Sequence, residues 1–222
     1  MNAESSSPVV MMPTAPSKRI WRWLGWLVLA LALGGAAAGG FLAYRYYFDH
    51  TFNGGIVSPI EQAPDITLID QTGQPFNLSD AKGKWILLDY GYTTCPDVCP
   101  ATLAILGRVQ DLLEEDADRI QVVFVTVDPE RDTPDKMGEY VNHFGDGTIA
   151  LTGSTEAIAA AAQPYGVRYA RVEMPESALV YAMNHTAFVY LINPDFEWVM
   201  VYPFGITAQD LTDDLQFLMS QE

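Results

Sequence analysis

The sequence is poor in cysteine, histidine and basic residues. Its 222 residues include 2 cysteines, 3 histidines and 12 lysines or arginines, against 28 aspartates or glutamates. After Arg45 the chain carries 27 acids and 8 bases, a net charge of −19. Binding to nucleic acid through a basic surface is therefore excluded, because such a surface neutralises phosphates with lysine and arginine. Adhesion of this acidic part to an anionic lipid surface is excluded for the same reason.

Charged residues are missing altogether from the 22 positions Trp23–Tyr44. A membrane-spanning helix needs about 20 apolar residues. This run therefore predicts one transmembrane anchor, which we assign to residues 23–45. A cleaved signal peptide, with the A-x-A pattern of Ala36–Ala38 as its cleavage site, is the alternative. The apolar run continues past that point to Tyr44, which favours an uncleaved anchor.

Basic residues mark the orientation of this anchor. Lys18, Arg19 and Arg22 lie directly before the apolar run, so the positive-inside rule places the N-terminus in the cytoplasm and the main domain outside. The sequence thus predicts four parts: a cytoplasmic segment at 1–22, the anchor at 23–45, a linker rich in Gly and Pro at 46–63, and a folded domain at 64–222.

Strand-like and helix-like segments alternate in that domain. Asp65–Asp70 with a turn at 71–74 predicts a β-hairpin. The apolar runs of Trp85–Tyr90 and Ile120–Val127 predict buried strands, and Pro100–Glu114 has helical spacing. Further helices are predicted at 133–144, 154–162 and 207–219, and strands at 186–192 and 198–202. This order predicts an α/β, thioredoxin-like fold, with a central mixed sheet, helices on both faces and an N-terminal hairpin.

Both cysteines occupy the loop between the first buried strand and the following helix. Cys95 and Cys99 stand in Gly91-Tyr92-Thr93-Thr94-Cys95-Pro96-Asp97-Val98-Cys99-Pro100. Pro100 suits the first turn of a helix. The partial positive charge of a helix N-terminus stabilises thiolates, which are both the nucleophilic and the metal-binding form of cysteine.

Three interpretations of this cysteine pair compete. A structural disulfide across three residues would close a very small loop and stabilise little. A redox-active dithiol usually has two residues between its cysteines, and here there are three. A metal site needs a third ligand, because two thiolates rarely complete a coordination shell.

The three histidines differ in their surroundings. His50 lies next to the membrane and His143 lies within a helical segment. His185 directly precedes a β-branched strand, in a loop that faces the cysteine loop in a thioredoxin-like arrangement. Two thiolates and one imidazole form a soft set of three ligands. Zinc usually requires a fourth ligand, whereas copper is satisfied with three, so the sequence predicts copper at Cys95, Cys99 and His185.

Three segments resemble the SCO/SenC family, the membrane-anchored copper proteins of cytochrome c oxidase assembly. They are the C-P-D-V-C-P of Cys95–Pro100, the D-P-E-R-D-T-P of Asp128–Pro134, and Asn184-His185-Thr186, in which Asn184 replaces the aspartate expected in the family. The resemblance covers about residues 60–220. It implies copper binding by Cys95, Cys99 and His185, with Asp128 as a nearby acid that supports the site rather than a ligand.

The same resemblance implies a role in assembling the binuclear CuA centre. The expected function is a copper metallochaperone for oxidase subunit II. The alternative is a thiol–disulfide oxidoreductase in which Cys95 and Cys99 keep the cysteines of that subunit reduced. Expected partners are the CuA domain, another periplasmic copper chaperone and a thioredoxin-like reductant. The expected location is the bacterial inner membrane with the domain in the periplasm, or alternatively the mitochondrial inner membrane. A peroxidase is disfavoured, since the pattern around a peroxidatic cysteine is missing.

Overall fold

The computed structural model describes residues 18–48, 51–145, 147–177 and 179–222. The chain divides into two compact units, Met1–Thr51 and Phe52–Glu222. His50 and the first 17 residues of the predicted cytoplasmic segment lie outside the described residues.

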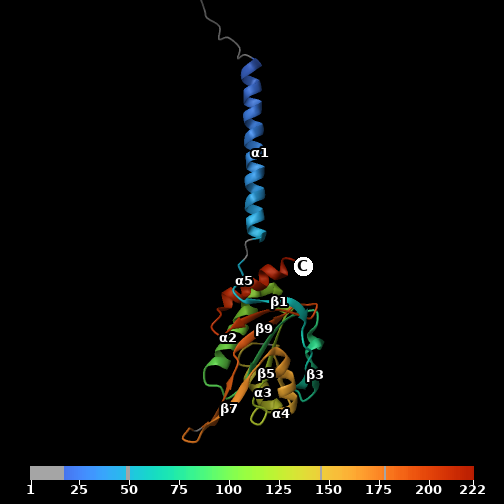
Figure 1. Cartoon of the computed structure of the whole chain (residues 1–222), viewed down its shortest axis with the longest axis vertical. Coiled ribbons are helices and arrows are strands. Elements are labelled where there is room, and N and C mark those ends of the chain that lie inside the picture. The colour runs from blue at the N-terminus through green and yellow to red at the C-terminus, as the bar shows by residue number, and fades with distance from the viewer. Residues whose placement is uncertain (1–17, 49–50, 146, 178) are drawn as a thin grey trace, which may run out of the picture. The chain divides into compact units, whose positions relative to one another are not determined.

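The first unit contains helix α1 (Lys18–Phe48) (Figure 1). Its stretch Trp23–Leu42 has a mean hydropathy of 1.8, and none of it is buried against other parts of the protein. An apolar helix of 20 residues is long enough to cross the hydrocarbon core of a bilayer. By length and composition, α1 is therefore a candidate transmembrane helix.

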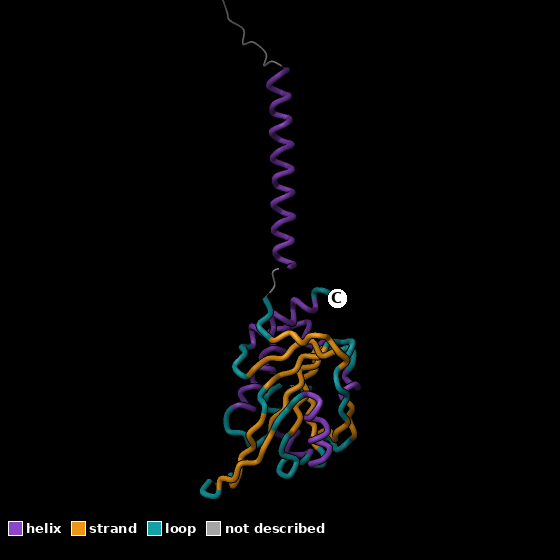
Figure 2. The backbone as a smooth tube through the Cα atoms, in the orientation of Figure 1, coloured by secondary structure: helices purple, strands orange, loops and turns teal. Residues whose placement is uncertain are grey.

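The second unit is built on an eight-stranded sheet with the order β1-β10-β9-β4-β5-β6-β2-β3. The neighbours β4, β5 and β6 run parallel, and the other pairs are antiparallel. Strands β7 and β8 form a separate two-stranded ribbon, visible as the long hairpin in Figure 2. The strands are β1 (Gly55–Gln62), β2 (Thr67–Asp70), β3 (Pro75–Asn77), β4 (Trp85–Gly91), β5 (Ile120–Thr126), β6 (Ile149–Thr152), β7 (Tyr169–Met174), β8 (Val180–His185), β9 (Phe188–Ile192) and β10 (Glu197–Pro203).

Helices cover both faces of the sheet. They are α2 (Val98–Leu113), α3 (Pro134–Val141), α4 (Thr155–Ala162) and α5 (Ala208–Met219), with short 3-10 helices at Leu78–Ala81, Glu114–Arg119 and Gln163–Tyr165. Side chains of α2, α3 and α5 pack on the face that includes Leu87, and α4 packs on the face that includes Leu88. Adjacent residues of a strand point to opposite faces, so the continuous apolar run of β4 fills both cores.

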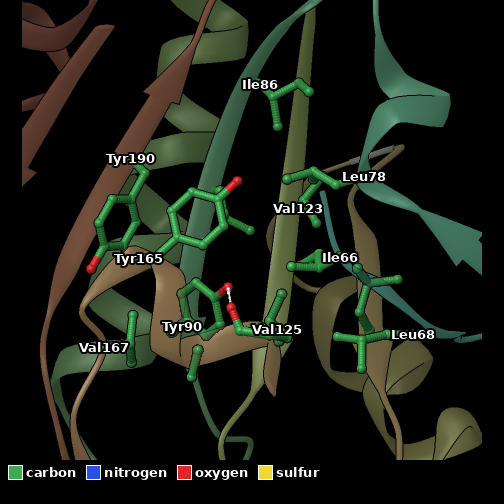
Figure 3. Packing of buried hydrophobic residues seen from close by; sticks show 14 of the residues in the cluster. Ile66, Leu68, Leu78, Ile86, Tyr90, Val123, Val125, Tyr165, Val167 and Tyr190 are labelled. Carbon is green, nitrogen blue, oxygen red and sulfur yellow. Dashed lines mark hydrogen bonds between the residues drawn. The ribbon is translucent and has the colours of Figure 1, made fainter. Parts of the chain in front are cut away.

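Three tyrosines lie together in the second of these cores. Figure 3 shows Tyr90, Tyr165 and Tyr190 beside the aliphatic side chains of β4 and β5. Tyr90 donates its hydroxyl hydrogen to the carbonyl oxygen of Ala161 in α4 (2.9 Å). A buried hydroxyl needs such a partner, and this bond fixes α4 against the sheet.

The predicted thioredoxin-like arrangement is confirmed. The sheet is mixed, helices lie on both faces, and β2 and β3 form the expected hairpin. The structure differs from the sequence interpretation at 46–63, where strand β1 occupies residues 55–62 of the predicted linker and pairs with β10. The strand was not recognised because Gly54, Gly55 and Pro59 are typical of a linker. Proline is tolerated in β1 because the strand lies at an edge of the sheet and has a register shift around this residue.

Candidate metal centre

The cysteine loop leaves the carboxyl end of β4 and enters α2. Cys99 is the second residue of this helix and is buried, while Cys95 lies in the loop before it and is half-buried. Both are free cysteines. The backbone N–H of Cys99 points to the Sγ atom of Cys95 (3.4 Å). The first amides of the helix therefore face the more accessible sulfur, as expected for a thiolate at a helix N-terminus.

The two thiols have opposite acid–base behaviour. The hydrogen bond from Cys99 is the largest influence on Cys95, and together with a smaller contribution from His185 it outweighs burial and lowers the pKa of Cys95 to about 3. The pKa of Cys99 is raised, first by its bond to Cys95 and then by burial. The pair thus shares one proton, which Cys99 keeps while Cys95 is the thiolate.

His185 reaches this pair from the end of the β7–β8 ribbon. Its Nε2 atom lies 3.4 Å from the Sγ atom of Cys99. Its Nδ1 atom lies 3.0 Å from the carbonyl oxygen of Thr186. Since a carbonyl oxygen only accepts, the proton is on Nδ1, and Nε2 is left with its lone pair toward the sulfurs. Burial lowers the pKa of His185, but hydrogen bonding to Cys95 and to Thr186 raises it further than burial lowers it.

Three ligand atoms converge at this point. The Sγ atoms of Cys95 and Cys99 and a ring nitrogen of His185 all lie within 4.8 Å of one another. Ligands about 2.0–2.3 Å from one ion are at most about 4.6 Å apart, so the three atoms are close to the spacing that a single metal ion requires. In the described part of the chain, no fourth Cys, His, Asp or Glu joins this group. The donor set therefore fits a soft ion with three protein ligands.

Gly91 leaves the space that Cys99 occupies. A Cβ atom at this position would lie 2.9 Å from the Sγ atom of Cys99 and 2.7 Å from the ring of Phe124. Both distances are shorter than ordinary van der Waals contact. The absence of a side chain at the end of β4 thus lets the buried cysteine approach the sheet.

Asp128 does not hydrogen-bond to the three converging side chains. Its buried carboxylate accepts a hydrogen bond from the Tyr181 hydroxyl (2.8 Å) and forms an ion pair with Arg131. Arg131 in turn donates to the carbonyl oxygen of Tyr181 (3.1 Å). Asp128 therefore contacts the ribbon that carries His185, and it can influence the site through the position of that ribbon.

Two other buried acids, which the sequence analysis did not single out, act on the cysteine loop. Asp132 accepts hydrogen bonds from the backbone N–H (3.0 Å) and the hydroxyl (2.5 Å) of Thr93, and so holds the loop. Asp89 lies in the middle of β4, two residues before Gly91 on the same face. The feature of the sequence that could have identified Asp89 is an acid inside an otherwise apolar strand. An unpaired buried charge costs free energy, so such a residue points to a special role.

The hydrogen bonds of His143 are made within its own segment and do not reach this group. His143 is exposed, and its Nδ1 atom lies 2.7 Å from the carbonyl oxygen of Glu139, one helical turn earlier. Of the two histidines in the described residues, only His185 joins the cysteines.

Residues 58–220 match the family model described as SCO1/SenC. The chain belongs to the SCO1/SenC family. It is 38% identical over 154 residues to the mouse "Protein SCO2 homolog, mitochondrial", a match that covers 68% of this chain and 60% of the mouse protein. The chain thus spans less than two thirds of that relative.

Solved structures of SCO1/SenC proteins share the fold. The crystal structure of Arabidopsis thaliana ScoI with copper bound has a TM-score of 0.68 and 34% identity, and the match covers 73% of this chain and all of that one. The solution structure of apo Sco1 from Thermus thermophilus has a TM-score of 0.68 and 35% identity, and the match covers 76% of this chain and 98% of that one.

Proposed function

We propose that this chain is a membrane-anchored copper-binding metallochaperone that assists assembly of the CuA centre of cytochrome c oxidase. The observation that carries the proposal is the convergence of Cys95, Cys99 and His185 within 4.8 Å. The copper bound in the Arabidopsis relative supports the choice of metal. The softness of the donor atoms supports copper independently, because two thiolates and an imidazole suit copper(I) and leave zinc without its usual fourth ligand.

The half-buried position of Cys95 suits transfer rather than permanent storage of the ion. Cys99 is almost fully buried and would hold the ion on the inner side of the site, whereas Cys95 and His185 are half-buried and could be reached by an incoming ligand. A recipient with its own thiolates can then replace these ligands one at a time. The proposed recipient is the CuA domain of oxidase subunit II, and the proposed donor is another copper chaperone.

The proposed location follows from the anchor and its basic flank. Residues 23–45 would span the bacterial inner membrane, with the segment 1–22 in the cytoplasm and the copper domain in the periplasm. The mitochondrial inner membrane is the alternative, and both mitochondrial and bacterial relatives exist. The candidate span Trp23–Leu42 in α1 supports a single-pass anchor.

Anaerobic titration of the reduced full-length chain in detergent tests the metal site. We expect one copper(I) per chain, and a loss of affinity of at least about tenfold in His185→Ala, since a lost ligand removes a direct bond. His143→Ala is the matched control, because this exposed histidine has no cysteine partner, and its affinity should equal that of the wild type. Unchanged binding in His185→Ala would refute the ligand set.

Thiol–disulfide exchange is the second candidate function, and the unequal thiols favour it. Cys95 is the accessible thiolate and would attack a disulfide of the partner, while the buried Cys99 would resolve the mixed disulfide. In the full reaction, two electrons pass from this dithiol to the partner's disulfide. The variant Cys99→Ser should therefore trap a mixed disulfide through Cys95 with an oxidised CuA domain. Failure to trap any adduct would exclude this activity.

A further inference from the structure

Asp89 is a buried carboxylate without a basic partner. It is 4% exposed, at the centre of β4, between Phe124 of β5 and Val189 of β9. Among the ion pairs formed by the described residues, none involves Asp89. A buried charge normally needs a partner of opposite sign.

The charged groups that act on Asp89 belong to the candidate metal centre, and His185 among them favours the ionised carboxylate. Asp89 and Gly91 point to the same face of β4, because alternate residues of a strand share a face. Gly91 is the position at which Cys99 touches the sheet. Two residues of a strand span about 7 Å, so the buried Asp89 lies about that far along β4 from the position that touches the Cys99 sulfur. At such distances in a buried environment, interactions between charges are strong.

The acid–base properties of the site agree with this placement. Burial raises the pKa of Asp89 to about 7, and the charge of His185 is the largest influence that opposes the rise. In the other direction, Asp89 contributes to the raised pKa values of Cys99 and His185. The carboxylate and the three converging side chains therefore act on one another electrostatically.

We propose that Asp89 sets the charge preference of the site, and that its carboxylate favours copper(II) over copper(I) at Cys95, Cys99 and His185. This inference rests on the proposed function. With two thiolates and a neutral imidazole, copper(II) gives a neutral site and copper(I) gives a site of charge −1. A nearby buried carboxylate repels the negative site and leaves the neutral one almost unaffected. Asp89 is thus a positioning charge rather than a ligand.

The ratio of copper(II) to copper(I) affinity tests this inference. Each affinity is measured separately on the full-length chain in detergent at pH 8, by competition with a chelator selective for that oxidation state. We expect Asp89→Asn to lower the ratio about tenfold, which is equivalent to a rise of about 59 mV in the one-electron potential of the bound ion. Asp89→Glu, which keeps the charge, should retain most of the wild-type ratio.

The matched control is Asp214→Asn. Asp214 is also fully buried, but its carboxylate accepts hydrogen bonds from the backbone of Asn53 and Gly54. The ratio of copper(II) to copper(I) affinity in Asp214→Asn should equal that of the wild type. A wild-type ratio in Asp89→Asn, or an equal fall in both asparagine variants, would overturn the inference and leave the proposed function standing. If the wild-type chain bound neither ion, the proposed function would fail, and the inference with it.

Discussion

The guanidinium carbon of Arg131 lies 3.7 Å from the ring centroid of Tyr181. Arg131 follows β5 in the main sheet, and Tyr181 belongs to β8, which ends at His185. Arg131 also donates to the carbonyl oxygens of Tyr181 (3.1 Å) and Leu179 (3.3 Å). Arg131 therefore helps to fasten the ribbon that carries the histidine to the body of the domain, together with the hydrogen bond from Tyr181 to Asp128.

This fastening should matter for metal affinity. We expect Arg131→Ala to lower copper(I) affinity by about tenfold, because residues that orient a ligand typically contribute 10- to 100-fold. Arg108→Ala is the control, since Arg108 is exposed and its ion pair is with Asp111 of the same helix, α2. Its affinity should stay near that of the wild type. Equal affinities in all three proteins would show that the ribbon does not depend on Arg131.

The alkylation rate of Cys95 should be almost independent of pH. Its pKa of about 3 means that the thiolate is present above this value and is lost only as the pH falls through it. An ordinary thiol with a pKa of about 8.5 reacts roughly a thousandfold more slowly at pH 5 than at pH 8. Mass-resolved reaction with iodoacetamide should show less than about a threefold change for Cys95 over this range.

Removal of the Cys99 thiol should make the alkylation rate of Cys95 depend on pH. In Cys99→Ala the hydrogen bond that most lowers the pKa of Cys95 is lost. We expect the rate at pH 5 to fall well below that at pH 8. A steep pH dependence already in the wild type would contradict the assignment of Cys95 as the thiolate.

Asp89 should make the metal-free protein less stable as the pH rises. The pKa of its carboxyl is about 7 in the folded state, against 3.8 in an unfolded chain. Between these values the folded state binds the extra proton, so the free energy of unfolding decreases with increasing pH. Relative to the wild type, Asp89→Asn should gain on the order of 2 kcal/mol in unfolding free energy between pH 5 and pH 8. Denaturant titrations of both proteins at the two pH values measure this difference, and a constant difference would contradict the prediction.

Gly91→Ala should disturb the site through overpacking. The added methyl group would lie 2.7 Å from the Phe124 ring and 2.9 Å from the Cys99 sulfur. We expect a destabilisation of about 1–3 kcal/mol and weaker copper(I) binding. Gly55→Ala is the control, because there the nearest atom would be a side-chain carbon 3.4 Å away. Equal stability and affinity in the two variants would show that Cys99 can move without cost.

Segments with strong local patterns were predictable from the sequence. The apolar runs of β4 and β5 and the spacing of α2 identified the core, and the motif Cys95–Pro100 identified the loop. The ribbon β7–β8 was not predicted, because many of its side chains are exposed and show no clear alternation. Strand β6 was missed because it has only 4 residues.

The three candidate ligands could be predicted from the sequence, but the residues that support them could not. His185 was singled out because the predicted topology placed it opposite the cysteines, and the structure brings them together across 86 positions of sequence. The hydrogen bonds from Thr93 to Asp132 join residues 39 positions apart, and no local sequence pattern predicts them. The role of Asp89 depends on which face of β4 meets Cys99, which only the three-dimensional packing determines.

Strand β1 determines where this chain can be shortened. It covers one edge of the sheet by pairing with β10, which carries Trp198, Met200 and Val201. An uncovered edge strand with apolar residues is a template for intermolecular pairing. A fragment beginning at residue 64 would lack β1 and would be prone to aggregate, although all three candidate ligands would be retained. Soluble fragments for biophysical work should therefore begin no later than Phe52, so that the whole strand and its first contacts with α5 are kept.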